Sequence, residues 1–274
     1  MLGLRYAIVA TATVFLGIST GSAETFDCII KPSMLLKIGS PIATTLQSVE
    51  VERGQHVTSG QVIARLESAV QAADVALDEA RASNRADVLS HQAKVDFAQA
   101  EDNRAEQLLQ SNNIPRQKVE ELRTNLRVAQ EDVQLAVTNY RLLVLQLERS
   151  KALLEQRTIR SPIDGIVVQR LLGPGEFVHE ESPIVEVAQI DPLYVEAYPP
   201  VRVSNQIKEG MTATVKPDGR PDRTYRASVN IVDHVFDPAS GTFGVRLLLP
   251  NPGGAASAGQ RCSVSFDPSG GPGG

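Results

Sequence analysis

Histidine and cysteine are the residue types in this sequence that would bind zinc or copper most readily. The 274 residues include four histidines and two cysteines. The histidines share no spacing typical of a metal site, and no cysteine lies near any of them. They are His56, His91, His179 and His234. We therefore expect no metal site and no cofactor.

Acidic residues and glycine-rich turns make no better case for catalysis. Asp164 and Glu176 are explained as turn residues rather than as a general acid and base. The segment GPGE at 173–176 is not followed by the helix and lysine that a phosphate-binding loop needs. The sequence predicts a protein that is not an enzyme.

The two cysteines stand near opposite ends of the chain. Cys28 and Cys262 can form a disulfide if the chain is exported, because oxidising compartments permit thiols to pair. Such a bridge would tie both ends of the chain together across a very long loop. The alternative is a pair of buried, unpaired thiols.

The first 23 residues have the features of a secretory signal peptide. An early arginine precedes an apolar stretch from Tyr6 to Ile18, and small residues precede a cleavage point after Ala23. The alternative is an uncleaved anchor in the inner membrane, although this stretch is shorter than the ~20 residues that span a bilayer. A formal net charge of −5 argues against a nucleic-acid partner.

One short pattern of β-branched residues, proline and glycine occurs twice in the chain. The matched positions, 121 residues apart, are Ser40-Pro41-Ile42 with Ser161-Pro162-Ile163, Gly54 with Gly175, Val57 with Val178 and Ile63 with Ile184. This composition is typical of strands and tight turns. Each copy is too short to bury a core of its own. We interpret the copies as two halves of one β-module.

The segment between the copies, residues 67–156, contains no glycine and one proline. Its many Ala, Leu, Glu, Gln and Arg residues favour helix. In its second part, apolar residues follow a heptad seam: Leu122, Leu126, Ala129, Val133, Ala136, Tyr140, Leu143 and Leu147. The first part has a weaker seam, which we assign to Val70, Ala73, Leu77 and Ala80, and then to Val88, Val95, Ala98, Ala105 and Leu109.

The seven residues SNNIPRQ at 111–117 divide this helical segment into two arms. Serine and asparagine favour turns, and Pro115 suits the first turn of a new helix. We expect the chain to reverse here. Two arms of about 40 residues would make an antiparallel hairpin on the order of 60 Å long.

The order of half-module, helical hairpin, half-module and β-region resembles the periplasmic adaptor subunits of bacterial tripartite efflux and export systems. These are also called membrane fusion proteins, or the HlyD-like family. The residues that carry the resemblance are VERGQHVTSGQVIARLES at 51–68, RTIRSPIDGIVVQRLLGPGEFV at 157–178 and PIVEVAQIDPLYVEAY at 183–198. The resemblance covers essentially the whole mature chain.

The resemblance implies an elongated α+β multidomain fold. A lipoyl-like β-sandwich would be split by a long antiparallel coiled-coil hairpin and followed by a small antiparallel β-barrel. The expected limits are 1–23 for the signal peptide, 24–36 for a strand joining the barrel and lipoyl region, 37–66 and 157–190 for the two lipoyl-like halves, 67–156 for the hairpin, 191–267 for the barrel and 268–274 for a disordered tail.

Lipoyl and biotinyl carrier domains present a lysine that the cofactor acylates, and this module has no such lysine. None occurs between Lys37 and Lys94 or between Lys151 and Lys208. The module is therefore interpreted as a structural mount for the hairpin. Thr44 stands where the second copy has Gly165, so we expect a less tight turn in the first copy.

The resemblance also implies partners in the periplasm: an inner-membrane transporter, an outer-membrane channel and further copies of the chain in a ring. Many such adaptors have an Arg at the hairpin tip, a Leu four residues later and a Ser or Thr seven beyond. Arg104 and Leu108 fit this spacing, but Pro115 takes the third position. Ile114 and Arg116 are further contact candidates.

Two alternatives remain open. The tip can be an ordinary capped helical turn with no partner. The chain can also be a periplasmic scaffold or binding protein that uses the same hairpin with a non-pump partner.

Overall fold

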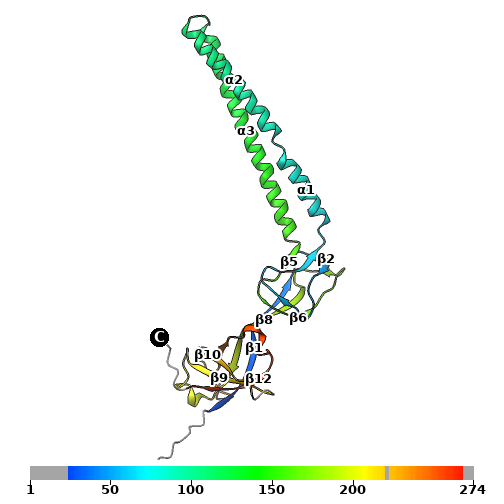
Figure 1. The fold of residues 1–274 in the computed structure, drawn as a ribbon, viewed down its shortest axis with the longest axis vertical. Coiled ribbons are helices and arrows are strands. Elements are labelled where there is room, and N and C mark those ends of the chain that lie inside the picture. The colour runs from blue at the N-terminus through cyan, green and yellow to red at the C-terminus, as the bar shows by residue number, and fades with distance from the viewer. Residues whose placement is uncertain (1–23, 220–221, 268–274) are drawn as a thin grey trace, which may run out of the picture. The chain divides into compact units, whose positions relative to one another are not determined.

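The computed structural model describes residues 24–219 and 222–267, which divide into two compact units. One unit runs from Met34 to Gln189 and holds the sandwich and the helices (Figure 1). The other joins the residues up to Ser33 to those from Ile190 onward and holds the barrel. The expected signal peptide and tail lie outside the described residues.

The sandwich is built from short strands of both sequence copies. One sheet has the order β5 (Thr158–Arg160), β4 (Val62–Leu66), β2 (Thr44–Val49), β7 (Phe177–Val178). Facing strands are β8 (Pro183–Ala197), β6 (Gly165–Arg170) and β3 (His56–Val57), and β1 (Thr25–Gly39) also pairs with β8. Leu46 and Ile63 of the first copy share one buried core with Val178 and Ile184 of the second. The split sandwich predicted from the repeat is confirmed.

The pairing between the two copies is symmetric, residue for residue. Thr44 pairs with Val178, and Val57 pairs with Gly165, which are the same two positions with the copies exchanged. The backbone bonds follow the same rule, since the Leu46 N–H donates to Glu176 at 2.8 Å and the Val167 N–H donates to Gln55 at 3.0 Å. Each half therefore supplies the hydrogen-bond partners that the other half lacks.

Gly54 and Gly175 occupy the same turn in the two copies, both with φ of +85°. A side chain is strained at such an angle, which explains why both copies have glycine there. The expectation about Thr44 and Gly165 was wrong, because both residues begin strands and neither lies in a turn.

Close packing explains why the two copies differ at Thr44 and Gly165. A Cβ atom at Gly165 would overlap the backbone of Ala188 on β8. Strand β8 continues past this point into the barrel, whereas its counterpart β4 ends at Leu66. Thr44 therefore has room for a side chain, and its hydroxyl accepts a hydrogen bond from Arg157.

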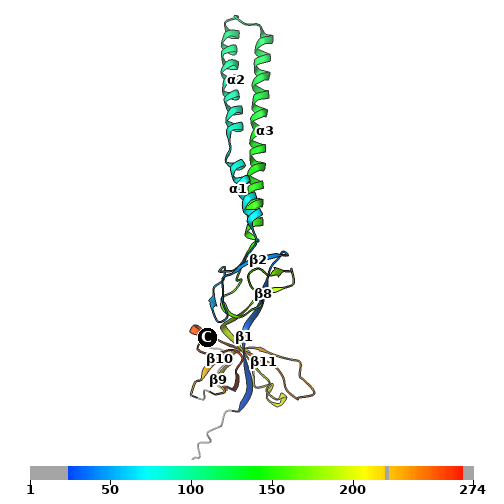
Figure 2. The same ribbon diagram turned by 90° about the vertical axis from the view of Figure 1, so that its right-hand side faces the viewer.

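Three helices form the hairpin. The first arm consists of α1 (Ala69–Ser83) and α2 (Ala86–Gln110), and the second arm is the single helix α3 (Arg116–Glu155). Both helices of the first arm pack against α3, and the two arms run side by side in both views (Figures 1 and 2). At 1.5 Å per residue, the 40 residues of α3 extend about 60 Å.

The heptad seam predicted for the second arm is confirmed. All eight predicted residues, from Leu122 to Leu147, are buried or half-buried, and Val119 and Ser150 extend the seam at its ends. The neighbouring positions are mostly exposed. One stripe of α3 therefore holds the hairpin together.

The residues of α1 predicted to face α3 were wrong, by one or two positions in the sequence. Val70 is 68% exposed and Leu77 is 50% exposed. The residues that face α3 are Gln71, Val75, Asp78 and Ala82. In α2 the predicted residues do face α3, and His91 and Asp102 lie on the same seam. Between α1 and α2 the helix is interrupted at Asn84 and Arg85, which the sequence did not predict.

The barrel unit has its own core, in which Leu193, Val215, Leu247 and Val264 are fully buried. Its sheet has the order β1, β12 (Arg261–Phe266), β9 (Thr212–Pro217), β10 (Tyr225–Val232), β11 (Val245–Leu249), β8. Every register given for these pairs is antiparallel. Two short 3₁₀ helices, Val201–Val203 and Pro252–Gly254, lie in the connections.

Candidate functional site

The hairpin leaves the sandwich between two paired strands, β4 and β5. Arg65 pairs with Thr158, and the Leu66 N–H donates to the Arg157 carbonyl at 2.8 Å. The Arg157 guanidinium also donates to the Glu67 carbonyl at 3.1 Å. Both ends of the hairpin are therefore fixed to the same edge of the sandwich by backbone and side-chain bonds.

A buried polar contact joins the two arms near this base. The Ser150 hydroxyl of α3 donates to the Asp78 carboxylate of α1 at 2.5 Å, and both side chains are about 95% buried. This hydrogen bond is the main reason why the pKa of Asp78 lies below its ordinary value, and Gln146 and Arg81 act in the same direction. A carboxylate buried in the seam is costly unless it is hydrogen-bonded. Because Ser150 supplies this bond, the contact fixes which residues of α1 face α3.

The hairpin tip is a Schellman turn built on asparagine. Asn112 has a φ of +55°, the left-handed conformation that normally falls to glycine. The Asn113 N–H donates to the Leu108 carbonyl at 2.9 Å, and the Asn112 N–H donates to the Leu109 carbonyl at 3.0 Å. These bonds satisfy two of the last four carbonyls of α2, those of Leu108 and Leu109. Asparagine adopts this conformation more easily than most side chains, so the reversal needs no glycine.

The predicted tip residues lie around this turn. Leu108 is 40% exposed on the last turns of α2, and Ile114 is half-buried in the loop. Pro115 is exposed and is the N-cap residue of α3, one position before the helix. Arg104 and Arg116 are both exposed, one on each arm. Nothing in this geometry identifies a partner, so their role remains a prediction.

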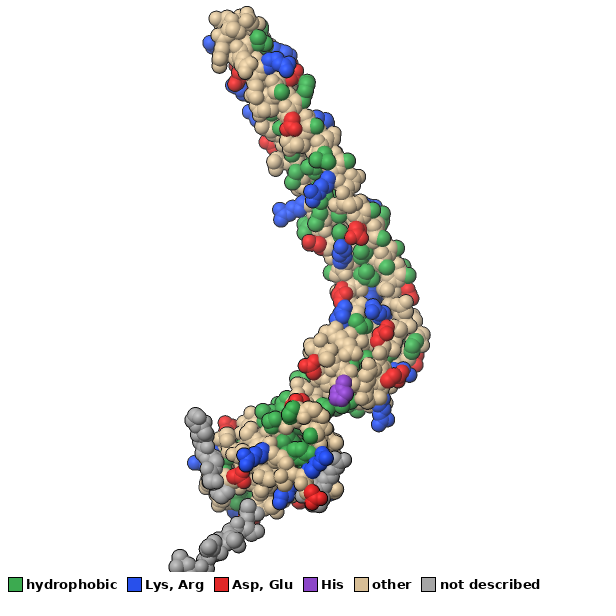
Figure 3. Space-filling model, in the orientation of Figure 1, with side chains coloured by type: hydrophobic (Ala, Val, Ile, Leu, Met, Phe, Trp, Pro, Cys, Tyr) green, Lys and Arg blue, Asp and Glu red, His purple; other side chains and the backbone are tan. Residues whose placement is uncertain are grey.

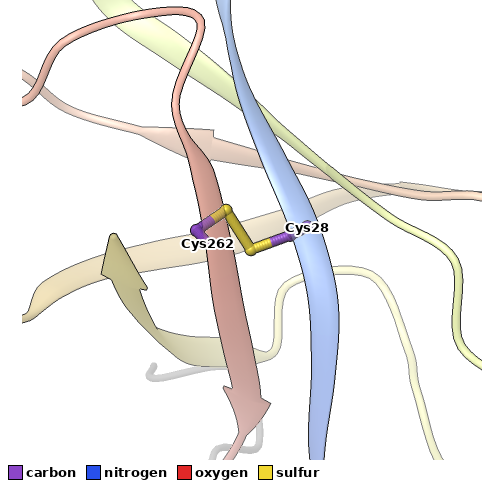
Figure 4. The surroundings of a disulfide bond; sticks show 2 residues. All are labelled: Cys28 and Cys262. Carbon is purple, nitrogen blue, oxygen red and sulfur yellow. A yellow bond between two sulfur atoms is a disulfide. The ribbon is translucent and has the colours of Figure 1, made fainter. Parts of the chain in front are cut away.

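The predicted disulfide between Cys28 and Cys262 is present (Figure 4). It joins β1 to β12 at a position where these two residues pair directly across the strands. The cysteines are 234 residues apart in sequence, and both are more than 90% buried. The first and last strands of the barrel are therefore covalently linked.

A charged cluster on the barrel joins three strands and was not expected from the sequence. The Glu196 carboxylate of β8 accepts from Lys31 of β1 at 2.5 Å and from Arg246 of β11 at 3.3 Å. The Lys31 bond is the largest cause that lowers the pKa of Glu196, and the same bond raises the pKa of Lys31. Such distant residues give no spacing signal in the sequence.

Within residues 24–219 and 222–267, no helix is long and apolar enough to cross a bilayer. No three His, Cys, Asp or Glu residues of the same ranges come together as metal ligands could.

A helical hairpin mounted on a split sandwich, followed by a β-barrel, defines the architecture of the membrane fusion proteins. Residues 35–189 match the family described as the CzcB-like barrel-sandwich hybrid domain, and residues 192–270 match the CusB-like β-barrel domain. The chain belongs to this family of periplasmic adaptors.

Individual relatives are distant. The UPF0194 membrane protein in the asrC 5′ region of Acidithiobacillus ferridurans is 30% identical over 122 residues, which cover 40% of this chain and 36% of that protein. A UPF0194 membrane protein of Citrobacter koseri is 26% identical over 73% of this chain and 71% of its own length.

The crystal structure of MacA from Actinobacillus actinomycetemcomitans has the same fold. It superposes with a TM-score of 0.72 at 17% identity, over 89% of this chain and 78% of that chain. Membrane fusion proteins work with inner-membrane transporters and outer-membrane channels in efflux systems, and they are generally not enzymes.

Proposed function

We propose that this protein is a periplasmic adaptor that links an inner-membrane transporter to an outer-membrane channel for efflux or export of small molecules. In this proposal the hairpin tip meets the channel, the barrel meets the transporter, and several copies assemble into a ring. The observation that carries the proposal is the hairpin itself, whose second arm is one uninterrupted helix of about 60 Å.

The chemistry of the tip supports a docking role. Leu108 exposes an apolar side chain beside a turn in which the Leu108 and Leu109 carbonyls already accept backbone hydrogen bonds. Arg104 and Arg116 flank it with positive charge. An apolar anchor with charged neighbours is a common arrangement at the centre of protein interfaces. Because Pro115 cannot donate a hydrogen bond, we propose that Ile114 and Arg116 supply the third contact.

The proposal is tested by cross-linking from the tip in living cells. A photo-cross-linking amino acid at Ile114 should capture an outer-membrane channel, which mass spectrometry identifies. The same amino acid at Gln134, exposed in the middle of α3, is the control and should capture no channel. If the folded protein captures no channel from Ile114, or captures it equally from Gln134, the tip does not dock there. A non-pump protein captured instead would support the scaffold alternative.

We also propose that the first 23 residues direct export and are removed after Ala23. The Cys28–Cys262 disulfide supports an oxidising compartment. Amino-terminal sequencing of the protein from the periplasmic fraction should begin at Glu24. A mature chain that begins at Met1 would indicate the uncleaved anchor.

A further inference from the structure

The first arm of the hairpin changes its helical phase where α1 meets α2. In α2 the residues that face α3 follow one heptad repeat: Val88, His91, Val95, Ala98, Asp102, Ala105 and Leu109. In α1 they are Gln71, Val75, Asp78 and Ala82. Val88 follows Ala82 by six positions, whereas the heptad repeat requires seven. The break at Asn84 and Arg85 absorbs this difference of one residue.

The heptad repeat of α2, continued backward through the break, falls on a different face of α1. This face consists of Val70, Asp74, Leu77 and Arg81. Val70 and Leu77 are 68% and 50% exposed. Hydrophobic side chains are exposed along the hairpin in the space-filling view (Figure 3). The face of α1 in phase with α2 therefore exposes its apolar pair, while the buried face contains the carboxylate of Asp78.

We infer that the first arm has a second form, in which α1 and α2 join into one continuous helix. We call the structure described above the interrupted form and the alternative the joined form. In the joined form α1 turns by about 100° about its axis, which corresponds to one residue of an α-helix. Val70 and Leu77 then face α3 in place of Gln71 and Asp78. The second arm remains the uninterrupted helix α3 seen in Figures 1 and 2.

Side-chain contacts at the break favour the interrupted form. The Asn84 side-chain oxygen accepts from the Ala86 N–H at 3.0 Å. The Arg85 Nε donates to the Tyr140 hydroxyl at 3.1 Å. The buried bond between Ser150 and Asp78, described above, acts in the same direction because it keeps the present face of α1 against α3.

The joined form replaces these contacts with backbone hydrogen bonds. In a continuous helix the N–H groups of residues 86–88 donate to the carbonyls of residues 82–84. Ser150 also keeps a partner, because the Gln146 carbonyl lies 3.1 Å from its hydroxyl. The two forms therefore exchange one set of hydrogen bonds for another, and the joined form also buries the apolar pair of α1.

The packing at the base of the hairpin leaves room for α1 to turn. A hollow of about 160 Å³ lies between the arms, with Gln71 and Asp74 of α1 on one side and Ser150 and Leu153 of α3 on the other. Asp74 lies on the flank of α1 that would turn toward α3. Arg157 lines the same hollow and offers the opposite charge to Asp74 in its new position.

Joining would also shorten the first arm relative to the second. Asn84 is extended, with a ψ of 108°. An extended residue advances the chain by about 3.3 Å, compared with about 1.5 Å in a helix. Because both ends of the hairpin are fixed to the sandwich, a difference of about 2 Å between helices about 9 Å apart would tilt the tip by roughly 10°.

This tilt is large enough to matter at the tip. The 25 residues of α2 extend about 37 Å, so the tip would move by about 7 Å. Use of the movement in docking rests on the proposed function. The two forms themselves belong to the single chain and can be measured without a partner.

Cysteine pairs distinguish the two forms in the full-length protein. Val75→Cys with Leu154→Cys reports the interrupted form, because both residues lie in the present seam, one helical turn from the contact between Asp78 and Ser150. Asp74→Cys with Leu154→Cys reports the joined form. With the native disulfide left in place, the Val75 pair should oxidise at least about tenfold faster than the Asp74 pair.

Asn84→Ala together with Ser150→Ala should shift the protein toward the joined form. The Asp74 pair should then oxidise at least about tenfold faster than before, and the Val75 pair more slowly. Adding Leu77→Glu should reverse both changes, because the joined form would bury the new charge. If the double variant does not fold, Asn84→Ala alone provides the same test, since it leaves the buried contact intact.

Ser83→Ala together with Thr138→Ala is the matched control. Each of these hydroxyls donates to a carbonyl of its own helix, one in α1 and one in α3. The control removes the same number of polar side chains from the hairpin without touching the break or the seam contact. Both oxidation rates should remain as in the parent protein.

Hydrogen exchange provides a readout that needs no added cysteine. In the interrupted form the N–H groups of residues 86–88 begin a helix, where donors lack intrahelical partners. In the Asn84→Ala/Ser150→Ala protein they should exchange at least about tenfold more slowly, although the cap on Ala86 is lost. A hairpin that was merely weakened would exchange faster at these positions.

Several results would overturn the inference. They are unchanged oxidation rates in the joining variant, faster exchange at residues 86–88, no reversal by Leu77→Glu, or the same shift in the control. All of these measurements use the purified protein alone. Failure of Ile114 to capture a channel would instead overturn only the channel contact.

Discussion

Gly165 shows how a single residue fixes the path of two strands. Its missing side chain lets the paired strands β6 and β8 approach each other closely at Ala188, before β8 continues into the barrel. The sequence comparison singled out this position, because Thr44 replaces glycine in the other copy. It could not supply the reason, which depends on where β8 goes after the repeat ends.

Substituting Gly165 with alanine should therefore destabilise the sandwich. The added methyl would overlap the Ala188 carbonyl and force β6 and β8 apart, at a cost of about 2 kcal/mol or more. Gly173→Ala is the matched control, because its nearest atom would be the Glu176 carboxylate at 3.6 Å. Urea unfolding of both variants gives the comparison, and equal midpoints would contradict the packing argument.

The cysteine pair allows a second prediction for single residues. Because the bridge closes a loop of 234 residues, the chain-entropy model gives about 5 kcal/mol, and measured values are commonly about 2 to 4 kcal/mol. The Cys28→Ser/Cys262→Ser variant should lose stability in this range. The wild-type protein should show almost no free thiol without reductant. Full thiol labelling, or an unchanged unfolding midpoint in the variant, would disagree with this expectation.

At the scale of the elements, the sequence predicted the seam of the second arm and that of α2 in the first arm, but not that of α1. The α3 seam consists almost entirely of apolar residues at regular spacing, so periodicity alone was sufficient. In α1 the apolar residues Val70 and Leu77 are exposed, while Gln71 and Asp78 face α3. Periodicity assigned the wrong face, because only the structure shows that Ser150 satisfies Asp78.

This contact predicts how the hairpin responds to acid. The pKa of Asp78 is lowered in the folded protein, chiefly by the Ser150 hydroxyl. The stabilisation is therefore present above the ordinary aspartate pKa of about 3.9 and is lost as the pH falls through the lowered folded value. Ser150→Ala should reduce the melting temperature at pH 7, and the difference from wild type should shrink below pH ~4.

Thr138→Ala is the control for this experiment. Its hydroxyl also lies on α3 but donates only to the Gln134 carbonyl within the same helix. Circular dichroism at 222 nm follows the helices during heating. A loss of stability in Ser150→Ala that does not change with pH would show that the carboxylate is not responsible.

At the scale of the whole molecule, the internal repeat predicted more of the fold than any other feature of the sequence. The 121-residue offset identified two halves, and the symmetric pairing of Thr44 with Val178 and Val57 with Gly165 follows from it. Partners outside the chain were not predictable in the same way. The exposed tip residue Leu108 does not by itself identify a partner protein.

The symmetric pairing predicts that the sandwich folds without its hairpin. Replacing residues 69–155 with a short glycine-serine linker should leave a protein that unfolds cooperatively, because Leu66 and Arg157 are already hydrogen-bonded neighbours. The helical signal should disappear, and the Cys28–Cys262 bridge should still form. A shortened chain with no cooperative transition would show that the helices stabilise the sandwich directly.

The hairpin separates the two halves of the sandwich in the sequence, and this order constrains how the protein folds during synthesis. A nascent chain that emerges amino end first presents β2, β3 and β4 to water, while their partners β7, β6 and β5 all follow the hairpin. Leu46 and Ile63 remain unprotected during that interval and invite aggregation. The two arms of the hairpin are consecutive in the sequence, so they can pack against each other early in folding. Packing of the two arms would bring β5, β6 and β7 next to β2, β3 and β4, so the hairpin would also assist the folding of the sandwich.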